Sequence, residues 1–160
     1  MSNETILYKR ARFSTRLPLD RRYTAAHYWL SEETSGVWRV GFTKFATRML
    51  GDLVEYEFSV NEGSRIALGQ QIGSIEGFKA LTAIYSVADG EFLGVGGDFE
   101  ADITLAESDP YGRGWLYGVK GQPDPGSVDV YGYIKLLDQT IDRLLESRHS
   151  TDSQGMDDEG

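Results

Sequence analysis

The spacing of glycine residues limits the folds that this chain can adopt more than any other feature of its sequence. The chain has nineteen glycines, and those in its middle separate short apolar runs. Short runs of β-branched and aromatic residues bounded by glycine are typical of strands joined by tight turns. Such strands are expected over residues 37–42, 53–60, 71–76, 80–87, 91–95 and 115–119. Many short strands at regular spacing predict a mainly β fold, either a small sandwich or a flattened barrel.

One of these runs alternates strictly, which also predicts its buried face. In residues 53–60, the apolar set Val54, Tyr56, Phe58 and Val60 points to one side and is expected to face the core. The acidic residues Glu55 and Glu57 share the other side. We expect that side to be solvated, because no apolar pocket is evident that would separate the pKa values of the two carboxyl groups.

Helical periodicity is confined to two segments. Residues 45–50 are expected to form a short helix that stops at Gly51. Residues 133–147 repeat apolar side chains at a spacing of about 3.6, which predicts an amphipathic C-terminal helix. We therefore expect one domain over residues 1–146 that includes this helix, followed by a disordered acidic tail over residues 148–160.

Composition excludes several classes of function. The chain has 16 Lys and Arg against 25 Asp and Glu, a net charge of −9 that would repel nucleic acid. No apolar run approaches the roughly 20 residues that span a bilayer, and no secretory signal is evident, so we expect a cytoplasmic, monomeric protein without a membrane partner. Without cysteine, and with only His27 and His149, the chain is expected to hold no metal.

One lysine stands between two strand-like arms of nearly equal length. Lys79 lies between Gly69 and Gly90, which we expect to frame a hairpin with the lysine at its tip. An accessible amine on a rigid base is what an acylating enzyme requires. On spacing alone, however, a lysine in a turn is most often simply solvated, because turns favour polar residues.

Four further motifs surround this hairpin. They are residues 23–29 (YTAAHYW), 41–46 (GFTKFA), 50–52 (LGD) and 109–115 (DPYGRGW). In order and spacing they resemble the glycine cleavage system H protein family, over about Arg22 to Val119. The resemblance implies a lipoyl domain, a hybrid barrel-sandwich of two small antiparallel sheets, and a carrier subunit of a multi-enzyme system instead of an enzyme.

Lys79 matches the lysine that carries the lipoyl group in this family. The family motif Glu-Ser-Val-Lys-Ala corresponds here to Glu76, Gly77, Phe78, Lys79 and Ala80. The resemblance therefore implies lipoate joined by an amide to Lys79, with the neighbouring motif residues read by lipoate-attaching enzymes. Biotin acceptors carry methionines around their lysine, so a biotin carrier is disfavoured.

The surroundings of this motif depart from the family pattern. Gly77 is expected to loosen the turn and Phe78 to expose a large ring beside the acceptor. Further departures are Tyr28, Val87, Gly96, Asp102-Ile103 and Glu107. They favour an H-like lipoate-binding protein of bacterial sulfur oxidation, whose arm carries a sulfur-bound intermediate to a heterodisulfide-reductase-like complex.

Two alternatives stay open. The first is a glycine cleavage H protein that carries an aminomethyl group between glycine decarboxylase, aminomethyltransferase and dihydrolipoyl dehydrogenase. The second is an unlipoylated scaffold with the same fold. His27 also has two interpretations, a contact for the arm or a partner, and a structural histidine hydrogen-bonded inside the barrel, of which the structural one is favoured.

Overall fold

The computed structural model describes the backbone of residues 4–159 and the side chains of residues 4–148. Its strands are β1 Thr5–Arg10, β2 Phe13–Pro18, β3 Arg22–Tyr23, β4 Tyr28–Thr34, β5 Val37–Phe42, β6 Leu53–Phe58, β7 Arg65–Ile66, β8 Gln71–Gly77, β9 Leu81–Tyr85, β10 Ala88–Val95 and β11 Tyr117–Pro123. Its helices are α1 Lys44–Leu50, α2 Gly97–Ala101, α3 Leu105–Ser108 and α4 Val130–Glu159. None of these helices is long and apolar enough to cross a membrane.

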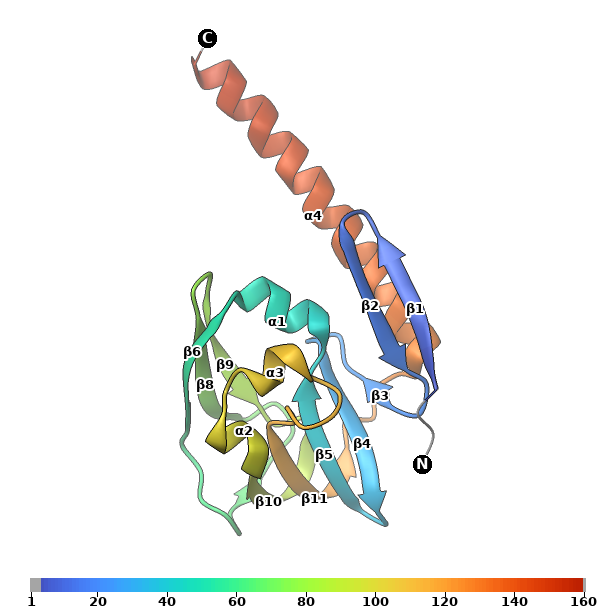
Figure 1. The fold of residues 1–160 in the computed structure, drawn as a ribbon, viewed down its shortest axis with the longest axis vertical. Helices are drawn as coiled ribbons and strands as arrows, with labels where there is room; N and C mark the ends of the chain where they lie inside the picture. The colour runs from blue at the N-terminus through green and yellow to red at the C-terminus, as the bar shows by residue number, and fades with distance from the viewer. Residues whose placement is uncertain (1–3, 160) are drawn as a thin grey trace.

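Two antiparallel sheets enclose the main core. One has the strand order β3-β4-β5-β11-β10-β7 and the other the order β6-β8-β9. Buried side chains from both sheets, including Val40, Ile75, Ile84, Phe92 and Tyr117, form one apolar cluster between them. In Figure 1 the smaller sheet closes one side of the domain, α1 lies across its top, and α2 and α3 lie in front of the larger sheet. The expected mainly β fold, a barrel-sandwich with a short helix and a C-terminal helix, is confirmed.

The predicted buried face of β6 is wrong at its first residue. The pairing of β6 with β8 shifts register between Leu53 and Glu55, so the alternation is broken there by a bulge. Leu53 is consequently buried, while Val54 is 48% exposed. Tyr56 and Phe58 pack against the core as predicted.

The C-terminal helix α4 begins earlier and ends later than the expected range 133–147. The Asp129 carboxylate accepts a hydrogen bond from the backbone N–H of Gly132 at 2.9 Å, which caps the first turn. The cap places Gly132 inside the helix. The side chains of residues 149–160 lie outside the described part of the chain, so the disordered tail expected over residues 148–160 stays a prediction.

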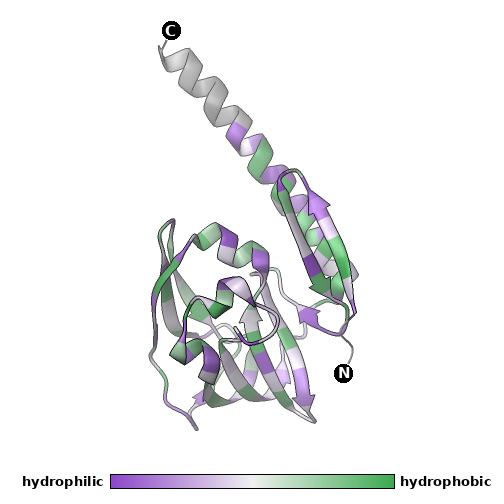
Figure 2. Cartoon of the chain, in the orientation of Figure 1, coloured by the Kyte–Doolittle hydropathy of each residue, from purple (hydrophilic) through white to green (hydrophobic). Residues whose placement is uncertain are grey.

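The hairpin β1–β2 was not expected from the sequence, and it packs against α4 (Figure 1). A second apolar cluster joins Tyr8, Phe13 and Leu17 of the hairpin to Tyr133 and Leu137 of the helix, among others. Figure 2 shows hydrophobic residues on both elements where they lie side by side. The hairpin and α4 therefore cover one another's apolar faces.

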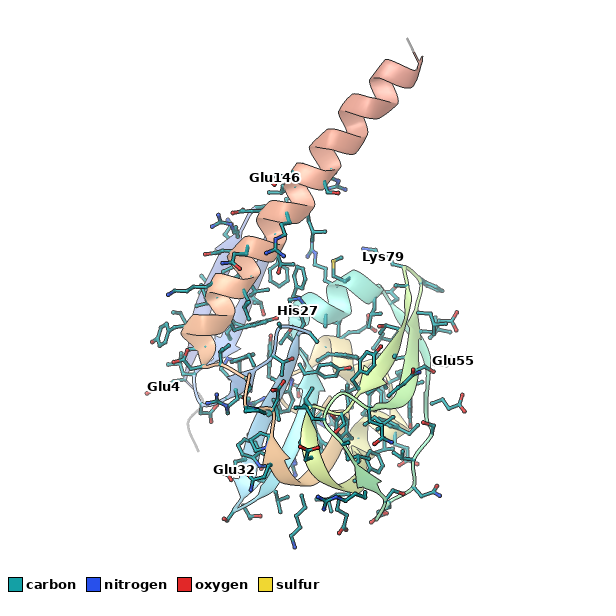
Figure 3. All side chains as sticks on the ribbon, turned by 180° about the vertical axis from the view of Figure 1, so that it is seen from behind. Glu4, His27, Glu32, Glu55, Lys79 and Glu146 are labelled. Atoms are coloured by element: carbon teal, nitrogen blue, oxygen red, sulfur yellow. The ribbon has the colours of Figure 1, made fainter. Side chains whose placement is uncertain are left out.

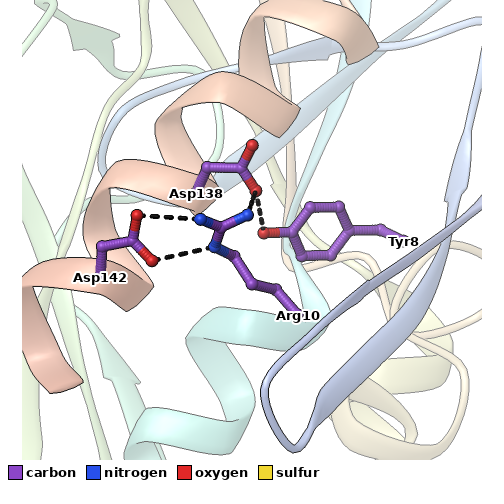
Figure 4. Close-up of polar contacts among 4 residues, drawn as sticks. All are labelled: Tyr8, Arg10, Asp138 and Asp142. Atoms are coloured by element: carbon purple, nitrogen blue, oxygen red, sulfur yellow. Dashed lines mark hydrogen bonds and ion pairs between the residues drawn. The ribbon is translucent and has the colours of Figure 1, made fainter.

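Polar contacts fix the same interface at its edge (Figure 4). The Arg10 guanidinium donates to both carboxylate oxygens of Asp142 at 2.9 Å each, and it lies 3.3 Å from a carboxylate oxygen of Asp138. The Tyr8 hydroxyl donates to Asp138 at 2.7 Å. Because the side chains of Arg10, Asp138 and Asp142 are 38–49% exposed, we ascribe orientation and not much stability to their ion pairs.

We predict that the hairpin belongs to the cooperatively folding unit. Leu17→Ala should lower the free energy of unfolding by about 2–5 kcal/mol, because Leu17 is fully buried against α4. The matched control is Leu7→Ala in the same hairpin, where the side chain is 58% exposed and the loss should stay below about 0.5 kcal/mol. Urea unfolding measures both, and equal small losses would show that the hairpin is a dispensable attachment.

Candidate functional site

Lys79 lies at the tip of the β8–β9 hairpin. The backbone N–H of Gly77 donates to the carbonyl of Ala80 at 2.9 Å, which leaves Phe78 and Lys79 as the connecting loop. Figure 3 shows Lys79 at the end of the hairpin, away from the body of the domain. Its side chain forms no ion pair or hydrogen bond with any described residue, so the amine is free for chemistry.

The C-terminal end of α1 holds this tip in place through the backbone. The N–H of Phe78 donates to the carbonyl of Asp52 at 3.0 Å, and the N–H of Lys79 donates to the carbonyl of Leu50 at 2.9 Å. The helix ends there because Gly51 adopts a positive φ of 76° and donates its N–H to the carbonyl of Thr47. The motif at residues 50–52 thus forms the support of the lysine, which its sequence position alone did not reveal.

Gly77 has a packing role that the sequence did not indicate. It is buried, and a Cβ placed on it would lie 2.2 Å from the carbonyl oxygen of Leu50. The expectation that Gly77 loosens the turn is therefore wrong, since its lack of a side chain allows the hairpin to approach α1 closely. Phe78 is 80% exposed, as expected for a ring beside the acceptor.

The remaining motif residues have mixed environments. Ala80 is exposed, while Glu76 is half-buried and lies opposite Leu81 in the hairpin. Glu55 of β6 lies opposite Glu76 of β8. It is exposed and visible at the outer edge of the sheet in Figure 3. No group of three or more His, Cys, Asp or Glu residues in the described part of the chain could hold a metal ion.

Gly69 lies at the opposite end of the β8–β9 hairpin from Lys79, and Gly90 lies beyond the hairpin, in β10. Gly69 occupies a turn with a positive φ of 84° and donates its N–H to the carbonyl of Ser86 at 2.8 Å. Gly90 is not in a turn: it lies within β10, where a Cβ would come 2.0 Å from the carbonyl oxygen of Lys120. It is needed for close strand packing, and not for a change of chain direction.

His27 connects the barrel to α4. Its Nδ1 atom lies 2.8 Å from the hydroxyl of Tyr133, which also lies 2.7 Å from the hydroxyl of Thr43. The imidazole is 4.6 Å from the ring of Phe45, centre to centre. Desolvation by burial lowers the pKa of His27 to about 4, so the ring is neutral at physiological pH. Figure 3 shows His27 between the barrel and α4, which supports the structural interpretation.

Together these features define a class of protein: a small barrel-sandwich that presents one free lysine on a braced hairpin, as carrier domains do. A family model described as "Glycine cleavage H-protein" matches residues 21–129. The chain is 34% identical over 126 residues to the glycine cleavage system H protein of Pseudoalteromonas atlantica, covering 77% of this chain and 97% of that protein. It is 36% identical over the same length to the H protein of Alteromonas mediterranea.

A solved structure agrees with these relatives. The crystal structure of a glycine cleavage system H protein from Mycobacterium marinum superposes with a TM-score of 0.66 at 31% identity, covering 73% of this chain and 95% of that one. The chain belongs to the glycine cleavage H-protein family, whose members are carrier subunits and not catalysts. The hairpin β1–β2 and the helix α4 lie outside the part that the family model matches.

The close approach at Gly77 predicts that the usual family residue is not tolerated here. Gly77→Ser should lower the free energy of unfolding by about 1–3 kcal/mol, because its Cβ would overlap the Leu50 carbonyl and push the hairpin away. The control is Gly97→Ser, since a Cβ at Gly97 meets nothing within 4 Å. Thermal or urea unfolding compares the two, and a Gly77→Ser protein as stable as the control would refute the packing role.

The half-buried, neutral His27 predicts a loss of stability in acid. Its folded pKa of about 4 lies below the unfolded value of about 6.5, so the unfolded chain binds the proton first. Stability is therefore complete above pH 6.5 and falls as the pH drops toward 4, by at most about 3 kcal/mol from this residue.

Urea unfolding of His27→Asn tests this, because asparagine tolerates the positive φ of 71° at this position. The variant should be less stable than the wild type at pH 7, and the difference should shrink toward pH 4. His149→Asn serves as the control for the other histidine. A constant difference between wild type and His27→Asn across this range would contradict the assignment.

Proposed function

We propose that this protein is a lipoyl carrier of the glycine cleavage type, with lipoate joined by an amide to Lys79. The observation that carries the proposal is the free, exposed lysine amine on a tip whose backbone is held by Leu50 and Asp52. The lipoyl group, once attached, supplies a dithiolane that accepts and releases an aminomethyl group. The partners are then lipoate-attaching enzymes, glycine decarboxylase, aminomethyltransferase and dihydrolipoyl dehydrogenase.

The protein itself contributes presentation and recognition. The two N–H groups of the loop are bonded to the last residue of α1 and to Asp52 just after it, so an enzyme that handles the arm meets a fixed base and a mobile side chain. A tethered group reaches each partner's site at a high effective concentration instead of diffusing freely. Phe78 and Glu76 flank the lysine and offer an apolar and an acidic contact to the enzyme that attaches lipoate.

The choice of cargo follows the relatives and not the altered motif. The relatives that match most of this chain are glycine cleavage H proteins, which favours the aminomethyl group over a sulfur-bound cargo. One departure that had favoured sulfur oxidation, Gly77, is explained by its packing against α1 and carries no information about cargo. We therefore propose an aminomethyl carrier that is monomeric and cytoplasmic. No observation favours a heterodisulfide-reductase-like partner.

Mass spectrometry of protein purified from its native host tests the attachment site. We predict one lipoyl-amide increment on the intact protein, mapped to the peptide that contains Lys79. Lys79→Arg should remove the increment and change the free energy of unfolding by less than about 0.5 kcal/mol, since the side chain contacts solvent. Lys120→Arg, also exposed, is the control and should keep the increment.

Two results would contradict the proposal. An unmodified Lys79 in protein from the native host would favour the alternative of an unlipoylated scaffold with the same fold. A large loss of stability in Lys79→Arg would show that the lysine supports the fold.

A further inference from the structure

A groove runs between the β1–β2 turn, α1 and α4, and it ends beside Lys79. We call it the α4 groove. It consists of two adjoining cavities of about 780 and 590 Å³, which share Arg48, Met49, Leu144, Leu145 and Arg148. The larger cavity reaches Arg12 in the β1–β2 turn, and the smaller one is lined by Lys79 itself. Figure 3 shows Lys79 on the same side of the molecule as the part of α4 that carries Glu146.

The groove has an apolar strip on two of its walls. Met49 of α1 is 46% exposed, and Leu144 and Leu145 of α4 are 42% and 40% exposed. They continue the apolar face by which α4 packs on the hairpin, where Ile141 and Phe13 are buried. Single exposed leucines are ordinary, but apolar side chains gathered along a cavity indicate a binding surface.

The charged side chains of the groove are all basic. Arg12, Arg48 and Arg148 are exposed and form no ion pair with any residue among 4–148. Arg10 also lines the groove, but Asp138 and Asp142 neutralise it. No carboxylate among the described residues lines either cavity, although the whole chain has a net charge of −9.

Most of this groove is built by elements that lie outside the match to the family model. The match to that model covers residues 21–129, so α1 lies inside it, while the β1–β2 turn and α4 lie outside it. These two elements pack on each other. Together they place Leu144, Leu145 and Arg148 in the cavity that Lys79 lines, and Arg12 in the adjoining one.

We propose that the α4 groove docks an acidic, amphipathic segment of a partner protein beside Lys79. Such a segment pairs its carboxylates with the unpaired arginines and its apolar side with the leucines and Met49. A nucleic acid or an anionic membrane fits less well, because these extended polyanions would also meet the acidic residues that predominate in this chain. Docking here brings the partner's own site within reach of a group carried on Lys79.

Fluorescence anisotropy with a synthetic probe tests this proposal on the full, unmodified chain. The probe is a labelled helical peptide with leucines at spacings of three and four residues along one side and glutamates along the other. We expect it to bind, and binding to weaken as ionic strength rises. A peptide of the same composition in scrambled order, and one with lysine in place of glutamate, should bind at least about tenfold more weakly.

Two pairs of substitutions locate the binding site. Leu144→Gln with Leu145→Gln should weaken binding of the acidic peptide by about tenfold or more, and so should Arg48→Glu with Arg148→Glu. Val54→Gln with Arg65→Glu is the matched control, since both side chains are exposed and neither lines the groove. Lys79→Arg should bind normally, which separates this test from that of lipoate attachment.

Three outcomes would overturn the proposal. Equal binding of the acidic, scrambled and basic peptides would show that the groove does not select this chemistry. Self-association in sedimentation experiments that Leu144→Gln with Leu145→Gln abolishes would assign the groove to a second copy of the chain. Loss of peptide binding on lipoylation of the wild type would assign it to the lipoyl arm.

Discussion

The contact between the hairpin tip and the end of α1 is the constraint on which the site depends. Two backbone hydrogen bonds, from Phe78 to Asp52 and from Lys79 to Leu50, fix the tip without using any side chain. Gly77 makes that approach possible because it has no Cβ, and Gly51 ends the helix at the required point. The result is a lysine whose backbone is fixed and whose amine is free. A carrier needs both properties, since partners must find the attachment point while the group that it bears must move.

The helix α1 also connects this tip to the rest of the molecule. On its inner side, Phe45 packs against His27 and Phe13, and so joins the barrel to the unit formed by β1–β2 and α4. On its outer side, Arg48 and Met49 form one wall of the α4 groove. Tyr133 completes this junction by contacting both His27 and Thr43, the residue that caps α1. The α4 groove and Lys79 therefore share one short helix as their common support.

Local signals in the sequence were enough for most of the fold, and long-range contacts account for what they missed. The strands near residues 37–42 and 71–76 and the stop at Gly51 follow from alternation and turn residues, which act over a few positions. The hairpin β1–β2 could not be predicted in this way, because its buried residues face a helix more than a hundred positions away. The same applies to His27, whose partner Tyr133 has no sequence signature, and to Gly77, whose packing against Leu50 is visible only in three dimensions. Lys79 was identified as the site lysine from the motif resemblance. The glycine spacing around it wrongly predicted that Gly90 frames the hairpin, whereas Gly90 lies within β10.

The central claim is that Lys79 carries a group which is loaded by one enzyme and unloaded by another. Its most direct test is a single loading reaction with the lipoylated protein, glycine and a glycine decarboxylase, followed by mass spectrometry of the peptide that contains Lys79. The expected result is a mass gain on that peptide equal to glycine minus carbon dioxide, with the aminomethyl group on one sulfur and a hydrogen on the other. This gain should be absent without glycine and absent in Lys79→Arg. A lipoylated protein that gains no mass under conditions in which a glycine cleavage H protein from a relative is loaded would contradict the claim.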